Sequence, residues 1–391
     1  MNTLSFPELL GKICRSKPMS ACVSAVTEGK FPLEIAGCEG AMGALLLARL
    51  YAARPGLYFA VVPQEADAAD LALDLASSSV PCLQFPWWGA VPYRELAPLS
   101  AVFGERVKVL GDLVLGKGGI VIIPQRAFLT PLPPPDYVKS LLVSLKPGGK
   151  IDTTGLAAQL VSYGYTRVPR VQLHGEFALR GEVLDILMGG DEEAYRILFD
   201  FDRVESIKCF DPLLQGSRPG REKLPELLIR PLREVVWTDE RIEALGDNLA
   251  AFKEFADGGK SIVEELIARR GMVGEEMLYP LAFERAGSLL DYLGAAGTLV
   301  LVDRERLENA QESLNREYQG LYARSRRESG QHRDYPLPDR LLFNFKELIE
   351  GYEIADPRLI AFKTIKSEPR AGACYIDIHC EPSRSFFGNI M

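Results

Sequence analysis

The sequence predicts an α/β protein in which one parallel-sheet domain is interrupted by a smaller α+β domain. Three observations support this prediction. Continuous apolar runs alternate with helical stretches in both halves of the chain, a proline-rich break ends the first series, and segments of alternating polarity follow the break. Continuous apolar strands separated by helices are typical of a parallel sheet covered on both faces.

Residues 1–130 are predicted to form the first part of the parallel-sheet domain. The expected strands are short apolar runs at residues 31–36, 57–63 and 120–124. Stretches rich in Ala and Leu at 44–53 and 65–76 are predicted to be the helices between them. Strands that alternate with helices in this way are joined by crossover connections and pair in parallel.

A proline-rich stretch, TPLPPPD, marks a domain boundary after residue 130. Its prolines exclude a helix or a central strand. Residues 131–213 are then predicted to form an inserted α+β domain with a helix at 156–163. Its expected antiparallel strands alternate in polarity and lie at 168–173, 176–179, 183–187, 195–201 and 204–210.

Residues 214–340 return to the α/β pattern and are assigned to the second part of the parallel-sheet domain. The expected elements are a strand-rich stretch at 227–237, helices at 238–256, 261–270 and 305–324, and a buried strand at 298–303. Residues 341–391 are interpreted as an extension toward further domains, with one strand at 373–379. Because the last residues resemble neither a helix cap nor a polar tail, we expect the chain to be part of a larger protein.

The length and charge of the chain limit its function. Its 391 residues suggest two or three domains. Lys and Arg total 45 against 53 Asp and Glu, a net charge of −8. A dedicated nucleic-acid binder is usually basic, so DNA is not expected to be the main ligand of this chain.

Cysteine usage and hydropathy give expectations about compartment and metal binding. The seven cysteines are scattered without a CxxC pair, and there are only three histidines, so no metal site is expected. Reduced thiols of this kind are typical of a cytoplasmic protein. The first residues are too polar for a signal peptide, and no apolar run of about 18 residues predicts a membrane span.

A glycine-rich loop lies between the first expected strand and helix, where ATPases carry the Walker A motif. A working loop reads GxxxxGK[ST], in which the lysine reaches the phosphates and the hydroxyl holds Mg²⁺. In the frame that includes Gly37 and Gly40, the last three positions are Met42, Gly43 and Ala44. The loop is therefore a degenerate phosphate loop, or a strand-to-helix turn with no phosphate role.

A second segment, residues 299–304, resembles a Walker B strand, which normally ends in Asp-Glu. Asp303 is present, but Arg304 replaces the glutamate that would position water. Together the two segments predict a degenerate RecA-like or P-loop-like domain. No catalytic residue, cofactor or metal is expected in this chain.

Three further stretches resemble a known family. They are residues 85–88 (FPWW) with Tyr93 and Arg106, residues 174–186 (HGEFALRGEVLDI) and residues 195–202 (YRILFDFD). Their order and spacing are similar to those of the N-terminal, UvrB-like module of transcription-repair coupling factors, and the resemblance covers essentially the whole chain. The second stretch is the most diagnostic.

The resemblance implies an architecture and a set of partners. UvrB has an ATPase-like domain interrupted by a domain that binds UvrA, so residues 131–213 are expected to bind UvrA. UvrB keeps its Walker lysine, whereas this chain has Gly43. Residues 93–106 are also too few to hold the aromatic hairpin with which UvrB clamps damaged DNA. Both departures match the coupling factors.

The coupling factors also bind RNA polymerase and double-stranded DNA, and they use ATP and Mg²⁺. The resemblance implies that these activities belong to domains further toward the C-terminus. This chain is expected to recruit UvrA to stalled RNA polymerase in transcription-coupled nucleotide excision repair, without catalysis of its own.

Four residues are candidates for the UvrA contact by their match to the family pattern. They are Arg167, Arg170 and Arg180, with Phe177 as an apolar neighbour. Arginine and aromatic side chains dominate interface energetics, and arginine makes bidentate contacts that lysine cannot. The alternative is that the arginines lie on a solvated strand face, in surface pairs worth about 0–1 kcal/mol.

Other functions remain open at this point. The first is an active, UvrB-type ATPase that verifies damage on DNA, which the residues at Gly43 and Ala44 oppose. The second is a nonspecific DNA-binding scaffold, which the net charge opposes. The pair Trp87–Trp88 could form a nucleic-acid stacking platform, although one ring of such a pair usually packs in the core.

Overall fold

The main sheet is seven-stranded and entirely parallel, in the order β15-β1-β14-β13-β2-β4-β3. The computed structural model describes residues 11–378, except 39, 79, 90, 95–99, 213–215, 218–222, 253–254, 256–258, 329–334, 356–357 and 365–367. The strands of this sheet are β1 (Leu33–Ala36), β2 (Leu57–Val62), β3 (Cys82–Gln84), β4 (Gly119–Pro124), β13 (Thr298–Val302), β14 (Leu359–Lys363) and β15 (Cys374–Asp377).

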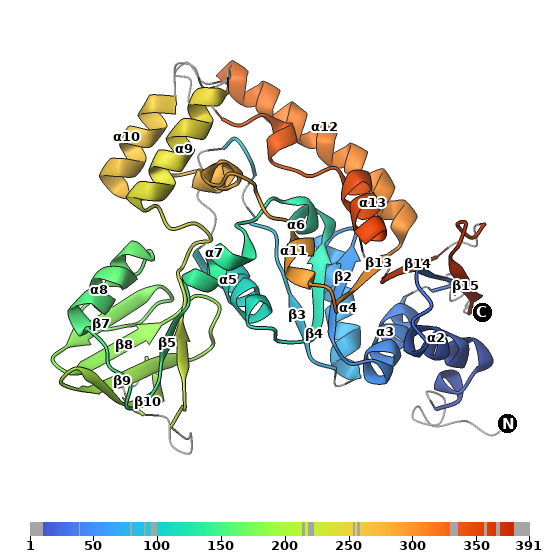
Figure 1. The fold of residues 1–391 in the computed structure, drawn as a ribbon, viewed down its shortest axis with the longest axis horizontal. Coiled ribbons are helices and arrows are strands. Elements are labelled where there is room, and N and C mark those ends of the chain that lie inside the picture. The colour runs from blue at the N-terminus through green and yellow to red at the C-terminus, as the bar shows by residue number, and fades with distance from the viewer. Residues whose placement is uncertain are drawn as a thin grey trace, which may run out of the picture.

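Helices cover both faces of the main sheet (Figure 1). Alternate residues of β2 face opposite sides: Phe59 and Val61 enter one core, and Tyr58 and Ala60 enter the other. One core is completed by α2 (Lys17–Thr27), α3 (Ala41–Ala53) and α4 (Glu65–Ser77). The other is completed by α5 (Ser100–Val114), α6 (Gln125–Leu129), α11 (Leu289–Leu293), α12 (Arg304–Glu328) and α13 (Phe345–Ala355). The expected layers, helix on sheet on helix, are confirmed.

The inserted domain contains a six-stranded sheet in the order β11-β10-β9-β8-β7-β6. Its strands are β6 (Thr166–Arg167), β7 (Glu176–Arg180), β8 (Val183–Leu187), β9 (Ala194–Asp200), β10 (Arg203–Asp211) and β11 (Gly216–Ser217). The helix α8 (Thr153–Ser162) and a two-stranded sheet of β5 (Val143–Leu145) and β12 (Leu227–Ile229) complete its core. The expected antiparallel meander is present from β7 to β10.

Three expectations about elements need correction. Residues 168–173 do not form a strand, because the extended segment ends with β6 at Arg167. Only residues 227–229 of the stretch 227–237 are a strand, and this strand pairs with β5. The inserted domain therefore continues past the expected boundary at residue 213.

The expected extension at 341–391 is the third correction. Two of its segments, β14 and β15, belong to the main sheet, and β14 lies between β1 and β13 near the centre. The second part of the parallel-sheet domain therefore does not end at residue 340. The other expected domain boundaries stay predictions.

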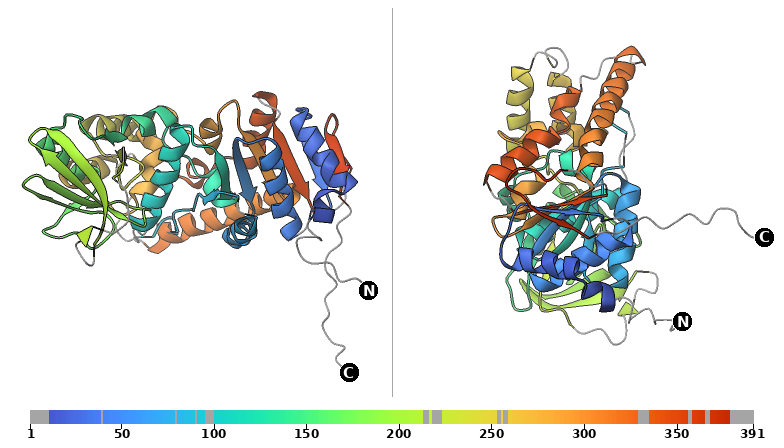
Figure 2. Two further views of the ribbon diagram at one scale, coloured as in Figure 1. Left: turned by 90° about the horizontal axis from the view of Figure 1, so that it is seen from below. Right: turned by 90° about the vertical axis from the view of Figure 1, so that its right-hand side faces the viewer.

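A further cluster of buried side chains is formed by helices that follow the inserted domain in the chain. It is built on α9 (Asp239–Ala251), α10 (Gly259–Arg269) and the 3₁₀ helix η2 (Glu275–Ala282). The short helix α7 (Pro135–Ser140) leads into the inserted domain, and the 3₁₀ turn η3 (Pro338–Arg340) follows α12. Figure 2 shows an elongated molecule, with the inserted sheet at one end and α2 and α3 at the other.

A buried ion pair joins the parallel-sheet domain to the C-terminal end of the insertion. Arg106 of α5 binds Glu234 through Nε and Nη2, and both side chains are fully buried. The guanidinium also donates to the carbonyl of Pro86 at 2.6 Å and lies over the ring of Phe85, while Trp88 Nε1 donates to Glu234 at 3.2 Å. The motif FPWW…R thus builds this junction. Because Trp88 is buried in it, the pair Trp87–Trp88 is not a stacking platform.

The inserted domain also meets α5 directly. Gly104 and Gly189 approach so closely that neither position has room for a side chain. Nearby, Asp191 receives ion pairs from Lys108 at 3.1 Å and from Arg230 at 2.6 Å. The glycines permit the backbone contact, and the buried carboxylate joins one cation from each domain.

Candidate functional site

The outer face of the inserted sheet is the face opposite α8, and it carries charged side chains. In β7, Phe177 packs into the core under α8. Because side chains alternate along a strand, Ala178 and Arg180 point to the opposite, outer face. The register places Ala178 beside Asp185 of β8, and Asp185 beside Arg196 of β9. These positions form a row across three strands, where side chains interact.

Asp185 organises this row. It is 1% exposed, and it accepts two hydrogen bonds from Arg196, at 2.6 and 2.9 Å. Arg180 donates to the same carboxylate at 2.8 Å but remains 50% exposed. The hydrogen bonds with Asp185 raise the pKa of Arg196 above its ordinary value. Arg196 therefore neutralises the buried carboxylate, and Arg180 keeps half of its surface for an external contact.

Arg167 reaches the same corner of the sheet from the edge strand β6. Its Nη2 donates to the carbonyl of Leu179 at 3.4 Å, on the strand edge that β6 leaves uncovered. Leu179 directly precedes Arg180, so Arg167 and Arg180 both lie near this uncovered edge. Arg180 is on the outer face, whereas Arg167 pairs with Phe177 and is on the face of α8. Arg170 is also exposed and lies in the loop after β6.

The prediction that Phe177 contributes to the UvrA contact is wrong. Phe177 is 0% exposed and packs with Leu184, Ile186 and Ile197 under α8. A partner could not touch this ring without opening the core. Successive side chains of a strand point to opposite faces, so Phe177 and Arg180 stand on opposite faces of β7 and cannot belong to the same contact surface.

Sequence reasoning missed Asp185 and Arg196. A carboxylate inside the apolar strand VLDIL was the signal, since a buried Asp needs a cationic partner. The cationic partner, Arg196, could not be identified, because the local sequence does not determine which residues of neighbouring strands lie opposite each other.

The degenerate phosphate loop lies at the carboxyl end of β1, as expected. Gly37 and Gly40 have positive φ, of 73° and 56°, and α3 begins at Ala41. However, the backbone N–H of Cys38 donates to the carbonyl of Lys363 at 3.2 Å. In a working loop such groups face the phosphates. A backbone N–H that would bind a nucleotide phosphate is therefore already hydrogen-bonded to the neighbouring strand β14.

Side chains also fill the space around this loop. Met42 and Ala44 pack into the core between α3 and the sheet, and the ring of Phe362 lies close to Gly43. Lys363 is buried, and its Nζ binds Glu34 at 2.7 Å instead of pointing to the loop.

Asp303 and Arg304, the two residues of the degenerate Walker B segment, stabilise the fold: one caps a helix and the other forms ion pairs. Asp303 adopts φ 61° and accepts from the N–H of Arg306 at 3.2 Å, which caps α12. Arg304 is buried and binds Glu308 and Glu353, each at 2.9 Å. Its positive charge is thus held by two carboxylates where an ATPase would hold water.

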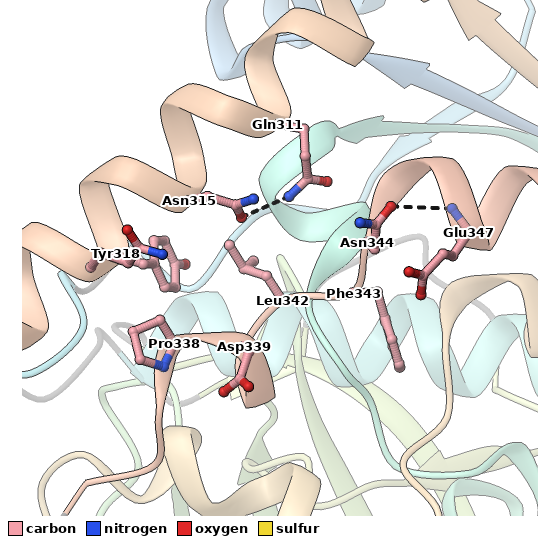
Figure 3. Close-up of a pocket in the computed structure, with 10 residues that line it drawn as sticks. Gln311, Asn315, Tyr318, Pro338, Asp339, Leu342, Phe343, Asn344 and Glu347 are labelled. Atoms are coloured by element: carbon pink, nitrogen blue, oxygen red, sulfur yellow. Dashed lines mark hydrogen bonds between the residues drawn. The ribbon is translucent and has the colours of Figure 1, made fainter.

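A cavity of about 380 Å³ lies between α12 and the segment from η3 to α13 (Figure 3). Gln311 and Asn315 of α12 line one side and are joined by a hydrogen bond of 2.9 Å, while Asn344 caps α13. Asp339 and Glu347 add two carboxyl groups. Within the described lining there is neither lysine nor arginine, so the cavity does not suit a phosphate group.

The described part of the chain lacks two other kinds of feature, a cluster of metal ligands and a membrane-spanning helix. No group of three or more His, Cys, Asp or Glu side chains is arranged to hold a metal ion. None of the helices there has the length and apolar character needed to cross a membrane.

Comparison with known proteins supports the family resemblance. Residues 143–234 match the family model of the UvrB interaction domain. This chain is similar in sequence to transcription-repair coupling factors. It is 27% identical over 248 residues to that of Borreliella burgdorferi, 28% over 283 residues to that of Rickettsia bellii, and 28% over 309 residues to that of Haemophilus influenzae.

The alignments cover different shares of the proteins. They include 63%, 71% and 78% of this chain, but only 21%, 25% and 26% of the three coupling factors. The chain therefore spans about a quarter or less of the relatives it matches. The matched UvrB interaction domain contains β5 and β12, in agreement with the longer inserted domain seen in the structure.

Proposed function

We propose that this chain is a recruitment module in which the inserted domain binds UvrA. The observation that carries the proposal is the arginine corner, formed by Arg167 and Arg180 at the free edge of the sheet. Arg196 and Asp185 hold Arg180 in place, and its exposed half can bind a carboxylate of a partner. The relation to coupling factors and the UvrB interaction domain support the same partner.

The wider role follows from the relatives. We propose that the whole protein acts at RNA polymerase and double-stranded DNA in transcription-coupled repair, with ATP and Mg²⁺ used in other domains. Within this chain we propose no cofactor and no catalysis. The occupied loop at Cys38 and the paired Arg304 support this over a UvrB-type ATPase.

The proposal is tested by calorimetric titration of UvrA into the chain. The double variant Arg167→Ala/Arg180→Ala is expected to bind at least about tenfold more weakly, or about 1.4 kcal/mol. It should remain folded, because Arg196 still pairs with the buried Asp185 through two hydrogen bonds after Arg180 is removed.

A matched control removes the same charge elsewhere. Arg269→Ala/Arg316→Ala deletes two exposed arginines that pair with glutamates of their own helices. This control should bind UvrA like the wild type. Equal weakening by both double variants would mean that net charge, not the arginine corner, determines binding. Failure of the wild-type chain to bind would reject the recruitment function.

A further inference from the structure

An exposed phenylalanine stands at the tip of the β9–β10 hairpin. Asp200 and Arg203 pair across the hairpin, so Phe201 and Asp202 form a two-residue connection. Phe201 is 83% exposed and has φ 54°. Positive φ is unusual for a bulky side chain, and a two-residue turn normally takes glycine at this position.

The side chain is therefore unfavourable for folding in two respects. Its backbone lies in the left-handed region, which is strained for residues other than Gly, Asn and Asp. Its ring exposes apolar surface and contributes to no core cluster in the described chain. A glycine would remove both disadvantages, so the folded chain alone gives no reason for a phenylalanine here.

The position of the tip gives a reason. The N–H of Phe199 donates to the carbonyl of Glu182 at 2.8 Å, which joins this tip to that of the β7–β8 hairpin. Arg180 pairs with Val183 in that hairpin, and Val183 pairs with Leu198 of β9. Phe201 therefore stands at the same end of the sheet as the arginine corner, with the half-buried Val183 and Leu198 between them.

We propose that Phe201 is the apolar anchor of the surface that binds UvrA. The inference rests on the proposed function and adds a residue to it. Aromatic and arginine side chains together are the usual composition of an interface hot spot. The two-residue turn also fixes the backbone at Phe201, so little backbone freedom is lost when the ring enters a pocket.

The charges around the ring specify the partner surface. Among the described residues, the exposed acidic side chains beside the tip are Glu182, Asp200 and Asp202. They outnumber the two cations there, Lys150 at 3.7 Å from Asp202 and Arg203 opposite Asp200. The partner is then expected to offer an apolar pocket with a basic rim for Phe201. Beside the pocket it should offer carboxylates for Arg167 and Arg180.

The test uses Phe201→Gly and Phe201→Asn in UvrA titrations, together with thermal unfolding. Both replacements tolerate positive φ, so the melting temperature should stay equal to that of the wild type or rise. UvrA binding should weaken at least about tenfold. Weaker binding by a chain of equal or higher stability cannot be attributed to unfolding.

Two comparisons make the result decisive. Ile354→Asn removes another exposed apolar side chain, on α13 outside the inserted domain, and should leave UvrA binding unchanged. If Phe201→Gly binds like the wild type while Arg167→Ala/Arg180→Ala binds weakly, the anchor is rejected and the recruitment function stands. If the wild type itself does not bind UvrA, both are rejected.

Discussion

At the scale of single residues, a buried carboxyl group should make stability depend on pH. Glu276 of η2 is 3% exposed, and its Oε2 has no hydrogen-bond partner in the described chain. Burial, with the nearby Glu275 and Glu234, raises its pKa from 4.5 to about 7. The folded state therefore keeps a proton between pH 4.5 and pH 7 that the unfolded chain releases.

The sign of the effect follows from this difference in bound protons. The free energy of unfolding should fall as pH rises through this window, by up to about 3 kcal/mol. Glu276→Gln, which carries no titrating proton, should remove most of this fall. Urea unfolding at pH 5 and pH 8 measures it, and an unchanged difference in the variant would assign the pH dependence to other groups.

Residue-level prediction from the sequence succeeded where a motif carried the information. Arg180 was found from the segment HGEFALRG, and it lies exposed at the corner of the sheet. Phe177, in the same segment, was assigned to the wrong face because its neighbours do not reveal which side of β7 meets α8. Phe201 was missed, since exposure and positive φ become visible only in the folded hairpin.

At the scale of elements, the phosphate loop should not regain nucleotide binding when a lysine is restored. Gly43→Lys places a cation at the Walker position, but Cys38 N–H remains bonded to Lys363 and Met42 stays in the core. We expect no ATP binding at millimolar concentration, by calorimetry with Mg²⁺. Gly320→Lys on α12 is the control for added charge. Micromolar binding by Gly43→Lys alone would show that only the cation was missing.

Elements with a continuous apolar run were predictable, and elements defined by their partners were not. The strands β2, β4 and β13 were recognised from their composition, and each is buried. The strand β14, LIAFK, lies in the stretch that was expected to be an extension, and it was not recognised as a strand. Its membership in the sheet depends on pairing with β1 and β13, and Lys363 is accommodated there by Glu34.

At the scale of the whole molecule, the Arg106–Glu234 pair links the parallel-sheet domain to the end of the insertion. Arg106→Met would leave Glu234 buried without its cation, and such a change costs about 3–5 kcal/mol. Arg106→Met/Glu234→Gln removes both charges but keeps an acceptor for Trp88 Nε1. The double variant should therefore lose less stability than the sum of the two single variants, in a double-mutant cycle measured by denaturant unfolding. Additive losses would mean that the two charges do not depend on each other, and that the glycine contact and Asp191 hold the inserted domain in place instead.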